Sequence, residues 1–300
     1  MSEYYKRPQL ADLDLPLGKR VRLHRLLYEH GIGGGRLMIL PIDQGIEHGP
    51  LNFFPNPDSK FPYFQYELAR RGGFSAIALH YGLASKYLRE YAGEIPLILK
   101  INGKTNVTSD DMAFSALTAT VEDAVRLGAD AIGYTLFVGS PRQDEDILQL
   151  TEVRQDCERF GMPLIVWSYP RGSAINVKGG RDSFYAVDYA ARLAEEFGAD
   201  IVKVNFPKID AEKDKTAPAP YNTLSVDENE AFRQVVQSAG RAMVLVSGGT
   251  KMSDADLLTK VRACMEAGAT GLIFGRNMWQ RPMDQALALV EQVKAIMMKF

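Results

Sequence analysis

The feature that most constrains the fold of this 300-residue chain is a regular alternation of apolar runs with amphipathic stretches, from near Leu37 to the C-terminus. Eight short runs are nearly continuous in apolar residues, a pattern typical of parallel strands covered by helices. We predict strands at residues 37–42, 74–79, 96–101, 129–135, 163–168, 199–205, 243–247 and 270–274.

The stretches between these runs have the periodicity of amphipathic helices. Glycines suited to end a helix in the left-handed conformation precede several predicted strands, at Gly128, Gly198 and Gly268. We predict helices at residues 17–30, 62–71, 85–91, 115–127, 145–160, 183–197, 228–239, 254–267 and 283–299.

Roughly eight strand–helix units in a chain of this length predict an α/β protein built as a (β/α)₈ TIM barrel. The alternative, a doubly wound open sheet, is less favoured because no glycine-rich dinucleotide fingerprint follows the first strand. The Gly33-Gly34-Gly35 run precedes that strand and is interpreted as a turn. We therefore expect one domain over residues 1–300, with residues 1–35 as a short N-terminal helical extension.

Composition excludes several classes of partner. The chain has 35 basic and 37 acidic residues, with the basic residues spread out, so we expect no nucleic-acid partner and no membrane partner. The N-terminus lacks the apolar run of a signal peptide. The two cysteines, Cys157 and Cys264, lie far apart in predicted helices, which favours a reducing, cytoplasmic location.

Lys203 lies in the apolar stretch from Ala199 to Phe206, near the C-terminal end of a predicted buried strand. A lysine rarely enters an apolar core unless it is paired or used chemically. Burial lowers the pKa of an amine, and a neutral amine in a dry pocket is the nucleophile that forms a Schiff base with a ketone. The alternative is a structural lysine that reaches water or pairs with Asp130 or Asp200.

Further polar side chains fall at the C-terminal ends of other predicted strands, where the chemistry of a barrel gathers. Each could instead cap a turn or fill the core, but their shared position favours an active site. They are Asp43, Glu47 and His48 after the first strand, Lys100, Asn102 and Lys104 at the third, and Trp167, Tyr169 and Arg171 at the fifth.

The last two strands end in glycine-rich turns that predict a phosphate site. Loops at this position of a barrel commonly bind phosphate through backbone N–H groups, and the guanidinium of an arginine can add a positive charge and paired hydrogen bonds. Two plain left-handed turns are the structural alternative. The residues concerned are Ser247, Gly248 and Gly249 after the seventh strand, and Gly275 and Arg276 after the eighth.

A second anion could be held by basic residues elsewhere at the same rim, Lys104 and Arg171. A substrate that carries two phosphates, with its carbonyl over Lys203, would fit such an arrangement.

Together these motifs resemble those of the class I fructose-bisphosphate aldolases of archaeal and bacterial type, the DhnA or FbaB group. Residues 41–50, 167–172, 201–205, 247–249 and 275–276 carry the resemblance, which extends from about Arg36 to the C-terminus. Gln44 departs from many relatives, which have histidine there. The resemblance implies a TIM barrel with a Schiff-base lysine, no metal or other cofactor, and a homo-oligomer, often a decamer.

The resemblance also implies roles for particular residues. Lys203 matches the Schiff-base lysine, Tyr169 the tyrosine that acts as general acid and base, and Asp43 the acid near the lysine. The implied substrate-binding residues are the pocket-lining Trp167 and His48, Arg171 near the distal phosphate, and Ser247, Gly248, Gly249, Gly275 and Arg276 at the proximal phosphate.

The implied activity is reversible cleavage of fructose 1,6-bisphosphate to dihydroxyacetone phosphate and glyceraldehyde 3-phosphate, a lyase reaction of glycolysis and gluconeogenesis. A protonated imine on Lys203 would supply the electron sink, and Tyr169 would transfer protons. A metal-dependent aldolase is not expected, because the four histidines, His24, His30, His48 and His80, lie on separate predicted elements.

Two alternatives stay open at this point. A related Schiff-base synthase or thiolase would keep Lys203 and act on another phosphorylated ketone. A non-catalytic phosphosugar-binding barrel would keep the phosphate loops but would need neither Lys203 nor Tyr169. The sequence also leaves open whether Lys100, Lys104 or Lys203 lies nearest the bound carbonyl.

Overall fold

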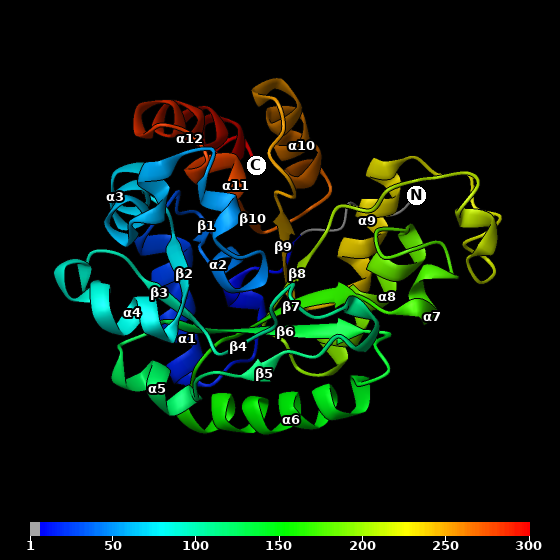
Figure 1. The fold of residues 1–300 in the computed structure, drawn as a ribbon, viewed down its shortest axis with the longest axis horizontal. Helices are drawn as coiled ribbons and strands as arrows, with labels where there is room; N and C mark the ends of the chain where they lie inside the picture. Colours follow the sequence, from blue (N-terminus) through cyan, green and yellow to red (C-terminus); the bar gives the residue numbers. More distant parts are fainter. Residues whose placement is uncertain (1–6) are drawn as a thin grey trace.

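The chain forms a closed barrel of eight parallel strands, each joined to the next by a helical connection (Figure 1). The computed structural model describes residues 7–300, so the first six residues of the expected N-terminal extension lie outside the described part. The (β/α)₈ prediction is confirmed. Around the barrel the strands are β1 (Leu37–Pro41), β2 (Ala76–His80), β3 (Leu97–Lys100), β6 (Ala131–Val138), β7 (Leu164–Pro170), β8 (Ile201–Val204), β9 (Met243–Ser247) and β10 (Gly271–Ile273), which pairs with β1.

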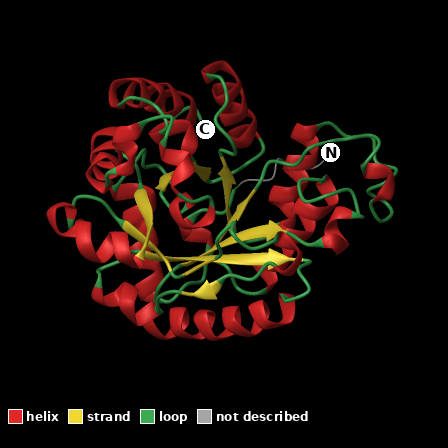
Figure 2. Cartoon of the chain, in the orientation of Figure 1, coloured by secondary structure: helices red, strands yellow, loops and turns green. Residues whose placement is uncertain are grey.

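Helices cover the outside of the barrel (Figure 2). As predicted, Gly128, Gly198 and Gly268 follow helices with left-handed φ values of 68°, 87° and 94°. The main helices are α3 (Pro62–Gly72), α4 (Tyr81–Tyr87), α5 (Val121–Arg126), α6 (Gln143–Phe160), α8 (Phe184–Glu196), α9 (Glu228–Ser238), α10 (Asp254–Glu266) and α12 (Met283–Met297). Shorter helical elements lie in the connections: α2 (Gln44–Glu47), η3 (Pro50–Phe53), η4 (Pro57–Lys60), η5 (Leu88–Tyr91), η6 (Asp110–Met112), α7 (Ser173–Asn176), η7 (Asp214–Thr216) and α11 (Arg276–Trp279).

The helix predicted at residues 115–127 is wrong over residues 115–120. There β5 (Ala116–Leu117) pairs antiparallel with β4 (Asn102–Gly103), and α5 begins only at Val121. Thr120 sets that start as a capping box, because its side chain accepts from the Asp123 N–H and the Asp123 carboxylate accepts from the Thr120 N–H. Similarly, the helix predicted at 85–91 begins earlier, as α4, and ends as the 3₁₀ turn η5.

Part of the N-terminal segment packs against the interior of the barrel, because Leu10, Leu23, Leu26 and Leu27 belong to the same apolar cluster as Leu37. The predicted helix 17–30 forms α1 (Leu17–His24) and the π-helical turn η2 (Arg25–Glu29), preceded by η1 (Leu10–Asp12). The Lys19 ammonium lies 2.9 Å from the Asp200 carboxylate, and the Arg25 guanidinium lies 2.8 Å from that of Asp130. Both carboxylates that could have paired with Lys203 are therefore engaged at the opposite end of the barrel.

The barrel has two separate apolar layers, which follow the alternation of side chains along each strand. One layer fills the interior and includes Ile165, Trp167 and Ile201; the other lies between strands and helices and includes Val202 and Val204. Lys203 alternates with Val202 and Val204, so its side chain points into the barrel rather than into the helical layer.

Within residues 7–300, no helix has the length and apolar content needed to cross a membrane.

Candidate active site

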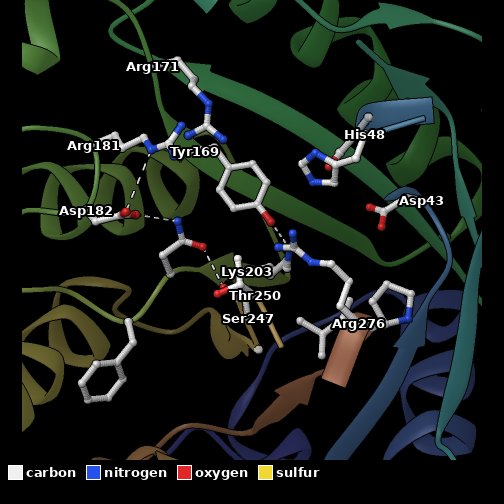
Figure 3. Close-up of a pocket in the computed structure, with 18 of the residues that line it drawn as sticks. Asp43, His48, Tyr169, Arg171, Arg181, Asp182, Lys203, Ser247, Thr250 and Arg276 are labelled. Atoms are coloured by element: carbon white, nitrogen blue, oxygen red, sulfur yellow. Dashed lines mark hydrogen bonds and ion pairs between the residues drawn. The ribbon is translucent and has the colours of Figure 1, made fainter. Parts of the chain in front are cut away.

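A cavity of about 510 Å³ lies at the C-terminal mouth of the barrel, within the size range of small-molecule sites. It brings together the site residues predicted from the sequence, except Lys100, Asn102 and Trp167, which are buried below it. Figure 3 shows Lys203 and Tyr169 in the middle of this cavity, with Asp43 and His48 on one side and Arg171 and Arg181 on another.

Lys203 projects from β8 into the base of this cavity and is only 6% exposed. Burial, with smaller contributions from the positive charges of Lys100 and Arg276, lowers the pKa of its amine from 10.5 to about 8. The negative charges of Asp43 and Glu47 act in the opposite direction. A substantial fraction of the amine is therefore neutral near physiological pH, as a nucleophile requires.

Tyr169 is the direct hydrogen-bond partner of Lys203. The Nζ atom of Lys203 donates to the Tyr169 hydroxyl and lies 4.5 Å from the centroid of the phenol ring. Register explains this contact, because Trp167 on β7 pairs with Lys203 on β8, and Tyr169 is the next inward-facing residue. A proton can therefore pass between the amine and the phenol without rearrangement of the backbone.

Trp167 lies deeper in the barrel than expected. It is fully buried and does not line the cavity, which corrects its expected place as a pocket-lining residue. The centroid of its ring lies 5.6 Å from the Lys203 Nζ and 4.8 Å from the Lys100 Nζ. Because Tyr169 stands two residues nearer the mouth on the same strand, Trp167 forms the apolar floor beneath the reactive amine.

Of the three lysines that the sequence left open, Lys203 is best placed to meet a carbonyl. Lys100 is fully buried, donates to the Thr135 hydroxyl and does not line the cavity. Lys104 does line it, but its ammonium donates to the carbonyls of Thr105 and Thr108 and to the Asp110 carboxylate.

The loop after β1 places Asp43, Glu47 and His48 on the cavity wall. Asp43 is 3% exposed. Burial and the neighbouring charge of Asp43 raise the pKa of Glu47 to about 7, so this carboxyl can exchange a proton near neutral pH. Burial lowers the pKa of His48, whose Nδ1 accepts a 2.8 Å hydrogen bond from the Asn106 amide.

The two predicted phosphate loops lie side by side at the ends of β9 and β10. The backbone N–H groups of Gly249 and Gly275 donate to no acceptor within residues 7–300, and Gly249 has a left-handed φ of 70°. Gly248 differs, because its N–H donates to the Ile273 carbonyl at 3.2 Å. Its missing side chain is needed for packing, since a Cβ there would lie 2.7 Å from Phe274.

Asn277 holds these loops in place and was not predicted from the sequence. Its fully buried amide donates to the carbonyls of Gly248 and Thr250, and its oxygen accepts from the Met252 N–H. The adjacent Arg276 lines the cavity, and burial lowers its pKa. The Arg276 Nε is buried and has no hydrogen-bond partner in the described part of the chain. A buried N–H without a protein partner is expected where a bound anion would accept its hydrogen bond.

A chain of hydrogen bonds links the phosphate loops to the far side of the cavity. The Ser247 hydroxyl donates to Asn205 at 2.7 Å, and the Asn205 amide donates to Asp182 at 2.9 Å (Figure 3). Beyond it, Arg181 lies 3.9 Å from Asp182. Asn205 stands two residues after Lys203 and shares its inward direction, a signal available in the sequence. Asp182 and Arg181 come from an irregular loop and carried no such signal.

The rim opposite these loops holds a cluster of charges around Asp110. The Asp110 carboxylate lies 3.0 Å from Lys104, 3.5 Å from Arg171 and 4.0 Å from Arg181. The structure thus brings together the two basic residues predicted to hold a second anion, and adds Arg181 and Asp110. Among residues 7–300, no group of three or more histidine, cysteine or acidic side chains is arranged to hold a metal ion.

Comparison with known proteins agrees with this geometry. The model of the DeoC/LacD family of aldolases matches residues 37–281. A relative from Thermoproteus tenax named fructose-bisphosphate aldolase class 1 is 39% identical over 262 residues, covering 86% of this chain and 90% of the relative. A protein of the same name from Halobacterium salinarum is 34% identical over 262 residues, covering 87% and 90%.

One solved structure is an archaeal fructose-1,6-bisphosphate aldolase whose catalytic lysine is covalently bound to the carbinolamine intermediate of the substrate. It shares 37% identity with a TM-score of 0.77, and the match covers 91% of this chain and 98% of that one. The chain therefore belongs to the DeoC/LacD family of aldolases. Within that family its similarity is to class 1 fructose-bisphosphate aldolases, which confirms the resemblance drawn from the motifs.

Proposed function

We propose that this protein is a Schiff-base aldolase that reversibly cleaves fructose 1,6-bisphosphate into dihydroxyacetone phosphate and glyceraldehyde 3-phosphate. The observation that carries the proposal is the position of Lys203, an amine with a lowered pKa at the base of the cavity and bonded to Tyr169. The names of the relatives in the DeoC/LacD family support the same reaction.

Imine formation begins when the neutral Lys203 amine attacks the keto carbon of the substrate. The free N–H groups of Gly249 and Gly275, with Arg276, would bind the phosphate next to that carbon. Holding the phosphate places the carbonyl at reacting distance from the amine, which converts binding into orientation. Tyr169 would supply and remove protons as the carbinolamine forms and loses water, because its hydroxyl already contacts the Lys203 nitrogen.

Cleavage follows when a base removes the proton of the C4 hydroxyl and the C3–C4 bond breaks, with its electrons passing into the protonated imine. Tyr169 is the proposed base. Asp43 would stabilise the cationic forms of Lys203, since its charge favours them. Glu47, with a pKa near 7, is suited to exchange protons with the remaining enamine before hydrolysis releases the ketone product.

The second phosphate of the substrate would bind at the rim where Lys104 and Arg171 converge, joined by Arg181. This arrangement favours a bisphosphate over a ketone with one phosphate. The His48 side chain would line the path between the two phosphate sites.

Borohydride trapping tests the proposal directly. With fructose 1,6-bisphosphate present, reduction should fix a substrate-derived adduct on the peptide that contains Lys203, as read by mass spectrometry. The Lys203→Met variant keeps the length and apolar stem of the side chain and should show neither adduct nor cleavage. An adduct on Lys104 instead, or full activity in Lys203→Met, would contradict the assignment.

Substrate choice is tested with the same assay. Cleavage of fructose 1,6-bisphosphate should exceed cleavage of fructose 1-phosphate, while a related synthase or thiolase would prefer another phosphorylated ketone. A non-catalytic barrel would bind these sugars and give no adduct.

A cytoplasmic location and a homo-oligomeric state complete the proposal. Exposed apolar side chains in the connection after β1 support an oligomer, because such patches on a protein surface often mark contacts. Leu51, Phe54 and Phe61 are 74%, 75% and 61% exposed. Light scattering coupled to gel filtration would measure the number of subunits.

A further inference from the structure

The rim cluster contains a carboxylate that competes with any incoming anion. Three cationic side chains, Lys104, Arg171 and Arg181, approach the single carboxylate of Asp110 within 4.0 Å. They come from two separate connections, after β3 and after β7, and Asp110 comes from the turn η6 in the first of them. All four side chains line the catalytic cavity.

The number of N–H donors on the Lys104 ammonium explains why Asp110 and an incoming anion compete for the same position. A lysine ammonium has three N–H donors. Those of Lys104 are directed to the Thr105 carbonyl at 3.1 Å, the Thr108 carbonyl at 2.9 Å and the Asp110 carboxylate at 3.0 Å. The two carbonyls belong to the same short loop as Lys104, so they hold the ammonium in place. A substrate phosphate can therefore bind Lys104 only by taking the position of Asp110.

The charges of the rim cluster favour the binding of an anion. Burial alone would raise the pKa of Asp110, but the hydrogen bond from Lys104 and the charges of Arg171 and Arg181 lower it instead. Arg171 is largely desolvated and Arg181 repels it, while the carboxylates of Asp110, Glu47 and Asp182 act in the opposite direction. Within 4.0 Å the three cations of the cluster meet two carboxylates, Asp110 and Asp182, so positive charge is in excess. Asp110 is itself 48% exposed through its side chain, which leaves it free to turn towards water.

We infer that Asp110 is a specificity-determining residue whose carboxylate occupies the rim subsite in the empty enzyme and is displaced by the second phosphate of the substrate. This inference rests on the proposed function. Its consequence is selectivity by charge. A dianionic phosphate can replace one carboxylate among three cations, whereas a neutral hydroxymethyl group cannot. The carboxylate also weakens retention of the phosphorylated aldehyde, since it can return as that product leaves.

The Asp110→Asn variant tests the inference, because it keeps the shape of the side chain and removes the competing charge. The KM for fructose 1,6-bisphosphate should fall about two- to fivefold, the size expected for one partly exposed charge contact. The KM for fructose 1-phosphate, which lacks the second phosphate, should not change.

Asp111→Asn is the matched control. It removes the same charge one residue away in the same turn, but Asp111 accepts from Ser109 and does not line the cavity. Both KM values should match the wild type in this variant. In the double variant Asp110→Asn/Lys104→Met, the gain in affinity for the bisphosphate should disappear, because the ammonium for which Asp110 and the phosphate compete has been removed.

An unchanged or raised KM for the bisphosphate in Asp110→Asn would overturn the inference, since Asp110 would then only order the cations. An equal change for both ketones would also overturn it. If the wild-type protein cleaves neither ketone, the proposed function itself fails and the inference fails with it. Cleavage of both ketones with no effect at Asp110 leaves the proposed function intact and rejects the inference alone.

Discussion

The Lys203 amine and the Tyr169 hydroxyl share a hydrogen bond at the base of the cavity, although 34 residues separate them along the chain. They stand on the adjacent strands β8 and β7, with Trp167 as the direct neighbour of Lys203 in register. Two strands that are neighbours in the barrel therefore hold a buried amine and a phenol in direct contact.

The pH dependence of activity should follow Lys203. The amine attacks only when it is deprotonated, and its pKa in the empty enzyme is about 8. The logarithm of kcat/KM, which reports groups of the free enzyme, should rise with pH below about 8 and level off above it. Rates of borohydride trapping should show the same midpoint. A profile that is flat from pH 6 to 9 would contradict this.

Lys100 should affect the pH at the midpoint of the kcat/KM profile without contacting the substrate. Its positive charge lowers the pKa of Lys203. Replacing it in Lys100→Met should therefore shift the rising limb of the profile to higher pH, whereas Lys100→Arg should leave the limb nearer its original position. A purely structural role for Lys100 would lower activity equally at every pH and leave the midpoint in place.

Tyr169→Phe should separate imine formation from cleavage. The variant keeps the ring above Lys203 and loses the hydroxyl, so a positioned proton donor and acceptor is missing. We expect kcat to fall by about 10²-fold or more, in the usual range for acid–base residues, while the adduct on Lys203 still forms, at a lower rate, during long incubation. Stopped-flow measurement of cleavage beside mass spectrometry of the trapped enzyme checks both parts. Wild-type rates would assign the proton transfers to another group.

The buried ion pair at the opposite end of the barrel should affect stability alone. Lys19 is 1% exposed and lies 2.9 Å from Asp200, whose side chain is 6% exposed. Lys19→Met leaves a buried carboxylate unpaired, which should lower the free energy of unfolding by about 3 kcal/mol in a urea titration. Adding Asp200→Asn should recover part of this loss. Activity per folded molecule should stay at the wild-type level in both variants.

Treatment with EDTA should leave the cleavage rate unchanged, because the protonated imine on Lys203 serves as the electron sink in the proposed mechanism. The measurement is turnover after prolonged dialysis against the chelator. Activity that disappears and returns with zinc would contradict an imine mechanism.

Local patterns in the sequence were sufficient to predict the eight strands, because continuous apolar runs of four to eight residues usually form buried strands in a protein of this class. They were not sufficient where a short-range cap competes with helix periodicity. The segment before Thr120 has the periodicity of a helix, yet the capping box makes the helix begin only after Thr120, and Ala116 pairs with Gly103 in a strand instead. Pairing between segments distant in sequence leaves no local signal.

The eight strands and the apolar surroundings of Lys203 could be predicted from the sequence alone, because strand periodicity and burial pattern are properties of neighbouring residues. The contacts between side chains follow instead from the folded barrel. It placed Trp167 beneath Lys203 instead of in the cavity wall, and it joined Asp110 to Arg171 and Arg181 at the rim. Those contacts depend on how separate loops come together above the closed barrel. The sequence around a charged loop residue does not indicate which other loop it will contact, so these distances could not be predicted from it.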